Sequence, residues 1–448
     1  MGNPGTSVRE SFSIFTASRL QLYGYALALI YAAALIHYYL ARAWIVDGSG
    51  APIYSDFTDA WVAGWHALNA DASQLYDSNE FVRIQKAIIG ARDYFYPNWP
   101  YPPTFFLILA PLSTLPYVNA FLTWDVATLL GCLLVVHLIV RRPPAIALVL
   151  ASPFTVWNFL AGQNGFLTAS LLGASLFFLE RRPIVAGAVI GCLTYKPQFG
   201  ILLPVALVAS RQWRAIASAG VAAAVLAGAS IALFGADTWA AFPNGFVEQS
   251  KLNLGAGPDS NWGYLQTVYG LIRTLNGSAT VAWLGQGLTA VSVALIVWLV
   301  WRSRVRYALK AATLSAAALI ATPYAFAYDM AALAIPGAFL VKDQIGHGML
   351  KGEQPIMIAL FGAPLATLVI LGDSPDHITF GGVPLGPFLV ITLLAVILRR
   401  ALPQSSAGLC VALRKTPPGR AYVTARVCDQ RHTKMQVLDS EACGCRYP

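Results

Sequence analysis

The chain has 448 residues, of which 57% are hydrophobic and only 11% are charged. Soluble domains carry roughly 25% charged residues, so this composition, with a mean hydropathy of +0.59, excludes an ordinary soluble protein and indicates an integral membrane protein. The net charge of +9 does not indicate nucleic-acid binding, because the basic residues stand in short clusters between apolar runs. That distribution is typical of the cytoplasmic loops of membrane proteins.

Apolar runs of about 20 residues, the length that crosses the hydrocarbon layer, recur along most of the chain. Residues 1–19 are polar and predict a cytoplasmic N-terminus, followed by a first span from Leu20 to about Ile45. The N-terminus lacks a short apolar region with a small-residue cleavage site, so we expect this span to remain as an anchor. The next apolar run, Thr104–Leu115, is short and contains a proline, so it either crosses the membrane or re-enters it.

The basic clusters distinguish these two topologies. If Thr104–Leu115 does not cross, Val118–Val140 runs inward and every later basic cluster faces the cytoplasm; if it crosses, all of them face outward. The clusters are Arg141-Arg142, Arg181-Arg182, Arg211 to Arg214, Arg302 to Lys310, Lys342 to Lys351 and Arg399-Arg400. We therefore predict an all-α polytopic membrane domain over residues 20–400, with about twelve transmembrane helices and both termini cytoplasmic.

This topology predicts two large outer connections, residues 46–103 and residues 236–278. The first is rich in Asp, Trp and Tyr, and an amphipathic helix at Phe57–Leu68 is expected to lie along the membrane interface. Nearly every unusual polar residue of the membrane domain falls on the outer face, whereas the inner connections are short and basic. We therefore expect a multi-pass protein of a bacterial-type plasma (inner) membrane whose active site is on the non-cytoplasmic face.

The last segment, residues 401–448, is predicted to be a basic, disordered cytoplasmic tail. Four of its residues invite a zinc-site interpretation, but their spacing is poor for a structural site. These residues are Cys428, His432, Cys443 and Cys445. The sequence therefore predicts no metal site.

Asp56 and Asp59 form an acidic pair at the start of the predicted outer helix. Positions i and i+3 of a helix share a face, so both carboxylates could point into one cleft. Partial burial against Trp61 and Trp65 would raise the pKa of a carboxyl group and make it a usable base near neutral pH. The alternative interpretation is a pair of ordinary solvated loop acids.

Three further groups carry polar side chains at the outer ends of predicted spans. Lys196, in an otherwise apolar stretch, suits a phosphate or pyrophosphate headgroup, or is a lysine that reaches from the end of a span to water. Gln163 and Asn164, between two glycines, either bind sugar hydroxyls or simply make a turn. Tyr324, Tyr328 and Asp329 follow a proline, and Asp329 either pairs with Lys196 or helps to position a ligand.

The chain has no Walker loop, dinucleotide-binding glycine motif or His-Glu-x-x-His zinc motif. A cytosolic nucleotide-sugar donor would need a soluble nucleotide-binding domain, for which the chain has no room. A lipid-borne donor is the consistent alternative, since it reaches an outer-face site through the bilayer.

Over roughly residues 50–345, the sequence resembles glycosyltransferase family 87, the polyprenol-phosphate-mannose-dependent α-mannosyltransferase type within the GT-C membrane glycosyltransferases. The motifs are weak singly, and their order and spacing carry the resemblance. They are Asp56-Phe57 with Trp61 and Ala63, Tyr76-Asp77, Tyr101-Pro102-Pro103, Leu115-Pro116, Gly162-Gln163-Asn164, Arg181-Arg182, Lys196-Pro197, Trp213-Arg214 and Phe234-Gly235.

The resemblance implies a GT-C-like helical bundle in which Asp56 is the general base. An acceptor hydroxyl would attack the anomeric carbon of a polyprenyl-phosphate hexose, with inversion, and Lys196 would hold the departing phosphate. Asp59 would support Asp56 or face water. Similar proteins often carry a histidine near Tyr324–Asp329, and this chain has none there. No metal and no cofactor is expected, and the partners would be the lipid donor, a lipid or glycan acceptor, and membrane lipids.

Two other functions fit a polytopic protein. A transporter or flippase of lipid-linked saccharides would use many spans and a few intramembrane charges, but no internal repeat relates the two halves of the chain. A scaffold without catalysis leaves the gathering of Gln163, Lys196 and Asp329 on one face unexplained.

Overall fold

The computed structural model describes residues 16–90, 96–255, 262–367, 379–380 and 382–413. The chain divides into two compact units, residues 1–408 and residues 409–448. Of the second unit only residues 409–413, the end of a helix, are described. The first unit contains the features discussed below.

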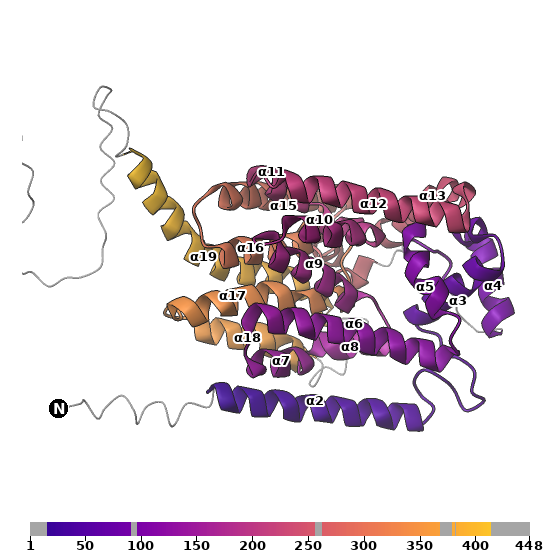
Figure 1. The fold of residues 1–448 in the computed structure, drawn as a ribbon. Helices are drawn as coiled ribbons and strands as arrows, with labels where there is room; N and C mark the ends of the chain where they lie inside the picture. Colours follow the sequence, from indigo (N-terminus) through magenta and orange to yellow (C-terminus); the bar gives the residue numbers. More distant parts are fainter. Residues whose placement is uncertain (1–15, 91–95, 256–261, 368–378, 381, 414–448) are drawn as a thin grey trace, which may run out of the picture. The chain divides into compact units, whose positions relative to one another are not determined.

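Long helices dominate this unit, and many of them run side by side (Figure 1). Four described helices are long and apolar enough to cross a membrane: α2 (Ala17–Leu40), α6 (Tyr117–Val140), α12 (Trp213–Phe234) and α15 (Ala279–Arg302). A fifth candidate is the bent pair α7 (Pro143–Leu150) and α8 (Pro153–Ala161), with an angle of 55° between its halves. The predicted all-α membrane protein is therefore what the structure shows, but helix length does not establish about twelve spans.

Shorter helices and one pair of strands complete the described part of the membrane domain. The helices are α9 (Gly165–Leu179), α10 (Pro183–Cys192), η3 (Leu193–Tyr195), η4 (Pro197–Gly200), α11 (Leu203–Ala209), α16 (Tyr307–Ala321), η6 (Tyr328–Leu333), α17 (Ala334–His347), α18 (Glu353–Ala366) and α19 (Gly386–Leu413). The antiparallel strands are β1 (Thr379–Phe380) and β2 (Val383–Pro384).

Helix α19 continues beyond the predicted domain boundary at residue 400. The predicted disordered tail, residues 401–448, therefore begins inside a helix. The residues of the zinc-site interpretation, Cys428 to Cys445, lie outside the described residues.

The first span ends earlier than predicted, at its C-terminal end. Helix α2 ends at Leu40, where Arg42 adopts a left-handed backbone with φ +57°. Ile45 and Val46 are only 2% and 4% exposed, and they pack in the aromatic cluster beneath α3. Their apolar character therefore reflects burial in protein and not contact with lipid.

The predicted first outer connection, residues 46–103, folds into a group of helices at one end of the bundle (Figure 1). These are α3 (Asp56–Asn69), η1 (Ala72–Tyr76), α4 (Ser78–Ile89), η2 (Pro103–Phe105) and α5 (Phe106–Leu112). Helix α5 has 7 residues and spans only about 10 Å, which is too short to cross the bilayer. This length fits the interfacial alternative for Thr104–Leu115.

The second outer connection, residues 236–278, is largely helical. It contains α13 (Ala236–Leu254), η5 (Trp262–Tyr264) and α14 (Val268–Thr274). Helix α13 packs against η1, so the two outer connections meet at the same end of the bundle (Figure 1).

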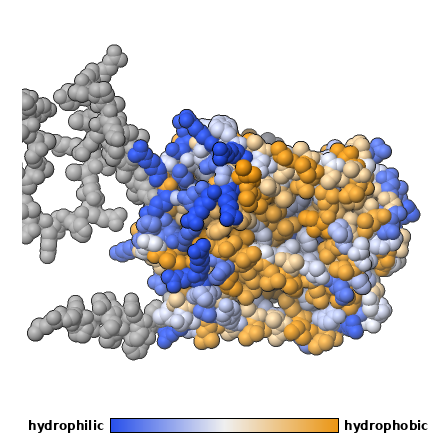
Figure 2. Space-filling view, in the orientation of Figure 1, coloured by the Kyte–Doolittle hydropathy of each residue, from blue (hydrophilic) through white to orange (hydrophobic). Residues whose placement is uncertain are grey.

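Hydrophobic residues cover the middle of the visible face of this unit, and hydrophilic residues gather at the end away from α3, α4 and α13 (Figure 2). Helix α16 lies inside, packed between α15 and α17, and its residues from Ala311 to Ala321 are all buried. Most of them are Ala, Ser or Thr, and such small side chains let membrane helices approach closely.

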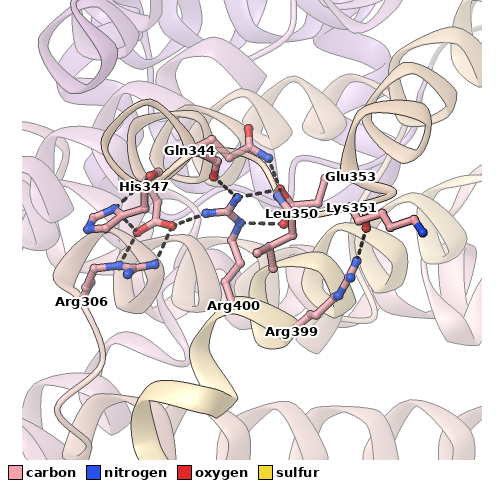
Figure 3. Close-up of polar contacts among 10 residues, drawn as sticks. Arg306, Gln344, His347, Leu350, Lys351, Glu353, Arg399 and Arg400 are labelled. Atoms are coloured by element: carbon pink, nitrogen blue, oxygen red, sulfur yellow. Dashed lines mark hydrogen bonds and ion pairs between the residues drawn. The ribbon is translucent and has the colours of Figure 1, made fainter. Parts of the chain in front are cut away.

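A buried ionic network ties α17, α18 and α19 together (Figure 3). The guanidinium of Arg400 donates to both carboxylate oxygens of Glu353, at 2.6 and 2.7 Å, and to Asp343 at 2.7 Å. Arg306 donates twice to Asp343, at 2.7 and 2.9 Å. Arg400 is only 4% exposed, so Glu353 depends on a buried cation for its compensation.

We expect Arg400→Leu to destabilise the protein by about 3–5 kcal/mol, because it leaves Glu353 as a buried, uncompensated charge. Thermal unfolding of the purified protein in detergent measures this loss. The matched control is Arg399→Leu, since the exposed Arg399 only donates to the Lys351 carbonyl. Equal melting temperatures for the two variants would contradict the importance of the network.

Candidate active site

A cavity of about 1550 Å³ lies where α3, α13, the α8–α9 turn and residues 321–328 meet. Six of the predicted site residues line it: Asp56, Asp59, Gln163, Lys196, Tyr324 and Tyr328. The other two, Asn164 and Asp329, are 3% and 0% exposed, and each accepts a hydrogen bond from the Lys196 ammonium. All eight predicted site residues therefore line one cavity or are bonded to a residue that lines it, although they come from segments far apart in the sequence.

Asp56 is the first residue of α3 and is exposed at the cavity wall. Ser55 precedes the helix, and its backbone N–H donates to Thr58 Oγ1 at 3.0 Å, which fixes the first turn. A carboxylate in the first turn is also favoured by the helix dipole. The helix is held in place by close packing: a Cβ on Gly64 would lie 2.5 Å from the carbonyl oxygen of Leu109 in α5.

Asp59 shares this face of α3 but is buried, at 7% exposed. Its Oδ2 accepts a hydrogen bond from the Tyr54 hydroxyl at 2.9 Å, and the Tyr54 oxygen in turn accepts from the Tyr96 backbone N–H at 2.8 Å. Burial, and then the negative charge of Asp56, raise the pKa of Asp59 well above its ordinary value. The i, i+3 prediction thus holds, and the structure separates the pair into one exposed and one buried carboxyl group.

Burial of Asp59 against Trp61 and Trp65 stays a prediction. Trp61 donates its indole N–H to the Leu115 carbonyl and packs on Tyr117, while Trp65 is 39% exposed. Tyr54 is the aromatic side chain bonded to the Asp59 carboxyl.

Lys196 is held by two side chains from distant segments. Its Nζ donates to Asp329 Oδ1 at 2.6 Å and to Asn164 Oδ1 at 2.7 Å. The aromatic rings of Phe199 and Tyr328 lie 5.4 and 5.1 Å from the ammonium. Lys196 is only 4% exposed, so it is not a lysine that reaches out to water. Of the alternatives for Asp329, the structure contains the ion pair.

The glycines around Gln163-Asn164 are required by close packing. Gly162 has φ +62° and ends α8, and a Cβ there would lie 2.5 Å from the Cβ of Phe57. A Cβ on Gly165 would lie 2.2 Å from the carbonyl oxygen of Tyr328. The tight turn therefore brings α3 and η6 together. Asn164 uses its amide within the protein, since its Nδ2 also donates to the Tyr101 hydroxyl at 2.8 Å.

Tyr101 connects the two charged parts of the site. Burial is the first cause that raises the pKa of its phenol, and the negative charges of Asp329 and then Asp56 raise it further. Both carboxylates therefore act on one side chain, so the Lys196 cluster and Asp56 share a single electrostatic environment.

Residues 99–323 of this chain match glycosyltransferase family 87. The chain belongs to this family. No curated protein and no solved structure matches the chain.

This family 87 protein is therefore a membrane glycosyltransferase. The matched segment contains Tyr101, the Gln163-Asn164 turn and Lys196, whereas Asp56 and Asp329 lie outside it. The family match therefore does not include Asp56, and its role is inferred from its position in the cavity wall. Among the residues that the structure describes, no three His, Cys, Asp or Glu side chains are grouped closely enough to hold a metal ion.

Sequence reasoning missed a polar wall of the cavity on α13. Gln249 and Asn253 are 6% and 1% exposed, and both bond to the Tyr96 hydroxyl. Their i, i+4 spacing was a usable signal, because it puts both amides on one helix face. Tyr264 of η5 also lines the cavity.

Proposed function

We propose that this glycosyltransferase moves a hexose, mannose by family resemblance, from a polyprenyl-phosphate donor to a lipid-linked or glycan acceptor at the outer face of the plasma membrane. The observation that carries the proposal is the single cavity whose wall contains both the exposed Asp56 carboxylate and the buried Lys196 ammonium. A general base and a phosphate-binding cation are the two groups that this transfer requires.

In the proposed reaction, Asp56 removes the proton of the acceptor hydroxyl as its oxygen attacks the anomeric carbon. The bond from that carbon to the phosphate oxygen breaks, and the electron pair leaves with the polyprenyl phosphate. Attack opposite the leaving group inverts the anomeric configuration. A base must reach the hydroxyl directly, which favours the exposed Asp56 over Asp59, whose Oδ2 is already bonded to Tyr54.

Lys196 is proposed to stabilise the negative charge that develops on the departing phosphate. An ammonium has three N–H donors, and two of them are used by Asn164 and Asp329. The third remains for a phosphate oxygen. Because Asn164 and Asp329 already hold the ammonium in place, it needs to move little when the phosphate leaves.

A lipid-borne donor is supported by the apolar residues beside the cavity. Phe246 and Val247 of α13 line it and are each 48% exposed. Such side chains suit contact with the apolar chain of a polyprenyl lipid at the membrane interface.

The outer-face assignment follows from the distribution of charge. We count about twelve apolar segments as crossings, including the short helices α9 to α11 and α16 to α18. With this count the basic clusters lie on the cytoplasmic side and the cavity lies on the outer side. Several of these helices are shorter than a full span, so the assignment depends on loop charge and not on helix length.

Reconstitution tests the proposed function. The full chain in liposomes, given polyprenyl-phosphate [³H]mannose and a membrane glycolipid extract as acceptor, is expected to transfer label to the acceptor. Label moved across the bilayer without transfer would support a flippase instead. Transfer from a nucleotide sugar, with none from the lipid donor, would rule out the proposed donor.

A further inference from the structure

A second cavity, of about 550 Å³, lies at the opposite end of α6 from the candidate active site. At the N-terminus of α6 the Tyr117 hydroxyl contacts Thr58 Oγ1 of α3 at 3.0 Å, whereas residues 138–140 at its other end line the second cavity. Helix α6 has 24 residues and is therefore about 36 Å long, slightly more than the hydrocarbon thickness of a bilayer. The two cavities thus open toward opposite faces of the membrane.

The rim of this second cavity is strongly basic. Four cations contribute to it from three places in the fold: Arg141 after α6, Arg181 and Arg182 between α9 and α10, and Lys342 in α17. Glu180 is the single acidic residue of its lining. In the part of the chain that the structure describes, none of the four cations has an ion-pair partner within 4.0 Å. Four cations against one carboxylate leave an excess of positive charge in this lining, and an anion bound between the cations would relieve their mutual repulsion.

The interior of the second cavity is aromatic. Phe177, Phe178, Phe339 and Tyr307 line it beneath the basic rim. Tyr307 has a partner inside the protein, since its hydroxyl donates to the Leu176 carbonyl. A cationic rim over an apolar interior suits an amphiphile whose anionic head meets the rim while its chain lies on apolar side chains.

We propose that this inner pocket, formed by Arg141, Arg181, Arg182 and Lys342 over the aromatic wall, binds the phosphate group of an anionic phospholipid in the leaflet opposite the active site. Guanidinium groups bind phosphate oxygens through paired N–H donors, and basic pockets between transmembrane helices recognise anionic headgroups. The inference requires only that the bundle spans a membrane and is independent of the proposed donor and acceptor.

The position of the pocket gives the lipid a structural consequence. Helices α9, α16 and α17 also reach from the candidate active site to this pocket, because their outer ends lead to Asn164, Thr322 and Asp329. A headgroup bound between their inner ends would hold together the same helices that position Lys196 at their outer ends.

Lipid binding by the purified full chain in detergent tests the proposal, with native mass spectrometry used to titrate phosphatidylglycerol. The double variant Arg181→Gln/Lys342→Gln is expected to bind this lipid about 25-fold more weakly, on the order of fivefold for each cation removed. The matched control is Arg214→Gln/Arg304→Gln, which removes two exposed cations that do not line the pocket. An equal loss in both double variants would overturn the proposal.

The control residues lie at the same end of the bundle. Helices α10 and α12 pack in parallel, because Gly187 meets Ala215 and Gly191 meets Ala222. Arg214, in the first turn of α12, therefore lies at the Arg182 end of α10. Arg304 precedes Tyr307, which lines the pocket. The two double variants therefore change the net charge of the same end equally.

A third variant excludes loss of folding as the cause. Glu180→Gln removes the single negative charge of the rim, so it is expected to strengthen phosphatidylglycerol binding about fivefold. Weaker binding in this variant would contradict the proposal. Phosphatidylcholine is expected to bind far less than phosphatidylglycerol, and equal binding would overturn recognition of an anion. Displacement of the lipid by millimolar glycerol phosphate would show a soluble phosphate site and overturn the lipid assignment.

Discussion

Asp56→Asn is expected to lower sugar transfer by roughly 10²–10⁴-fold, the usual contribution of a general base. Asparagine has nearly the shape of aspartate but cannot accept the proton of the acceptor hydroxyl. Because Asp56 is exposed at the first position of α3 and asparagine has nearly its shape, the replacement should leave the fold intact. The loss should therefore appear in kcat, with an unchanged melting temperature, in the reconstituted transfer assay.

Two matched variants make this result interpretable. Asp71→Asn removes a carboxylate from the same outer connection and keeps the hydrogen-bond acceptor that caps η1 at the Ser73 N–H, so transfer should be unaffected. Asp59→Asn also keeps an acceptor for Tyr54 and should cause a smaller loss than Asp56→Asn. If Asp56→Asn retains nearly full transfer while Asp59→Asn abolishes it, the base is Asp59 and the proposed roles are reversed.

The sequence was most informative where local spacing controls structure. The i, i+3 spacing of Asp56 and Asp59 is a property of one helix, and the structure places both residues in the first turn of α3. Loop charge also predicted that the two ends of the bundle differ, and hydrophilic residues gather at the end away from α3, α4 and α13 (Figure 2). Ile45 misled the prediction because an apolar residue buried in protein and one facing lipid look alike in a sequence.

Contacts between residues far apart in the sequence were harder to predict. Asn164 was interpreted as a turn residue or a sugar ligand, but its amide is used by Lys196 and Tyr101. The polar wall around Tyr96 was missed because it joins residues more than 150 positions apart, with 153 between Gln249 and its partner. Nothing in either local sequence indicates that partner, and only the packing of α13 against the first outer connection creates it.

The second large effect is expected from Lys196→Met. This change removes the cation proposed to hold the departing phosphate, and it leaves Asp329 as an unpaired carboxylate that is 0% exposed. Loss of one partner of a buried ion pair destabilises a protein by about 3–5 kcal/mol. Loss of a group that stabilises transition-state charge lowers kcat by about 10²–10³-fold. The single variant should therefore show both a lower melting temperature and little transfer.

The double variant Lys196→Met/Asp329→Asn separates these two effects. The amide oxygen of the introduced asparagine could still accept the Phe326 N–H, which Asp329 accepts at 3.0 Å, and no buried charge remains. The melting temperature should thus recover most of the loss, because removing both members of a buried pair costs far less than removing one. Transfer should stay low if the Lys196 ammonium acts on phosphate. Recovery of transfer together with stability would mean that the pair only supports the fold, and the phosphate would then need another cation.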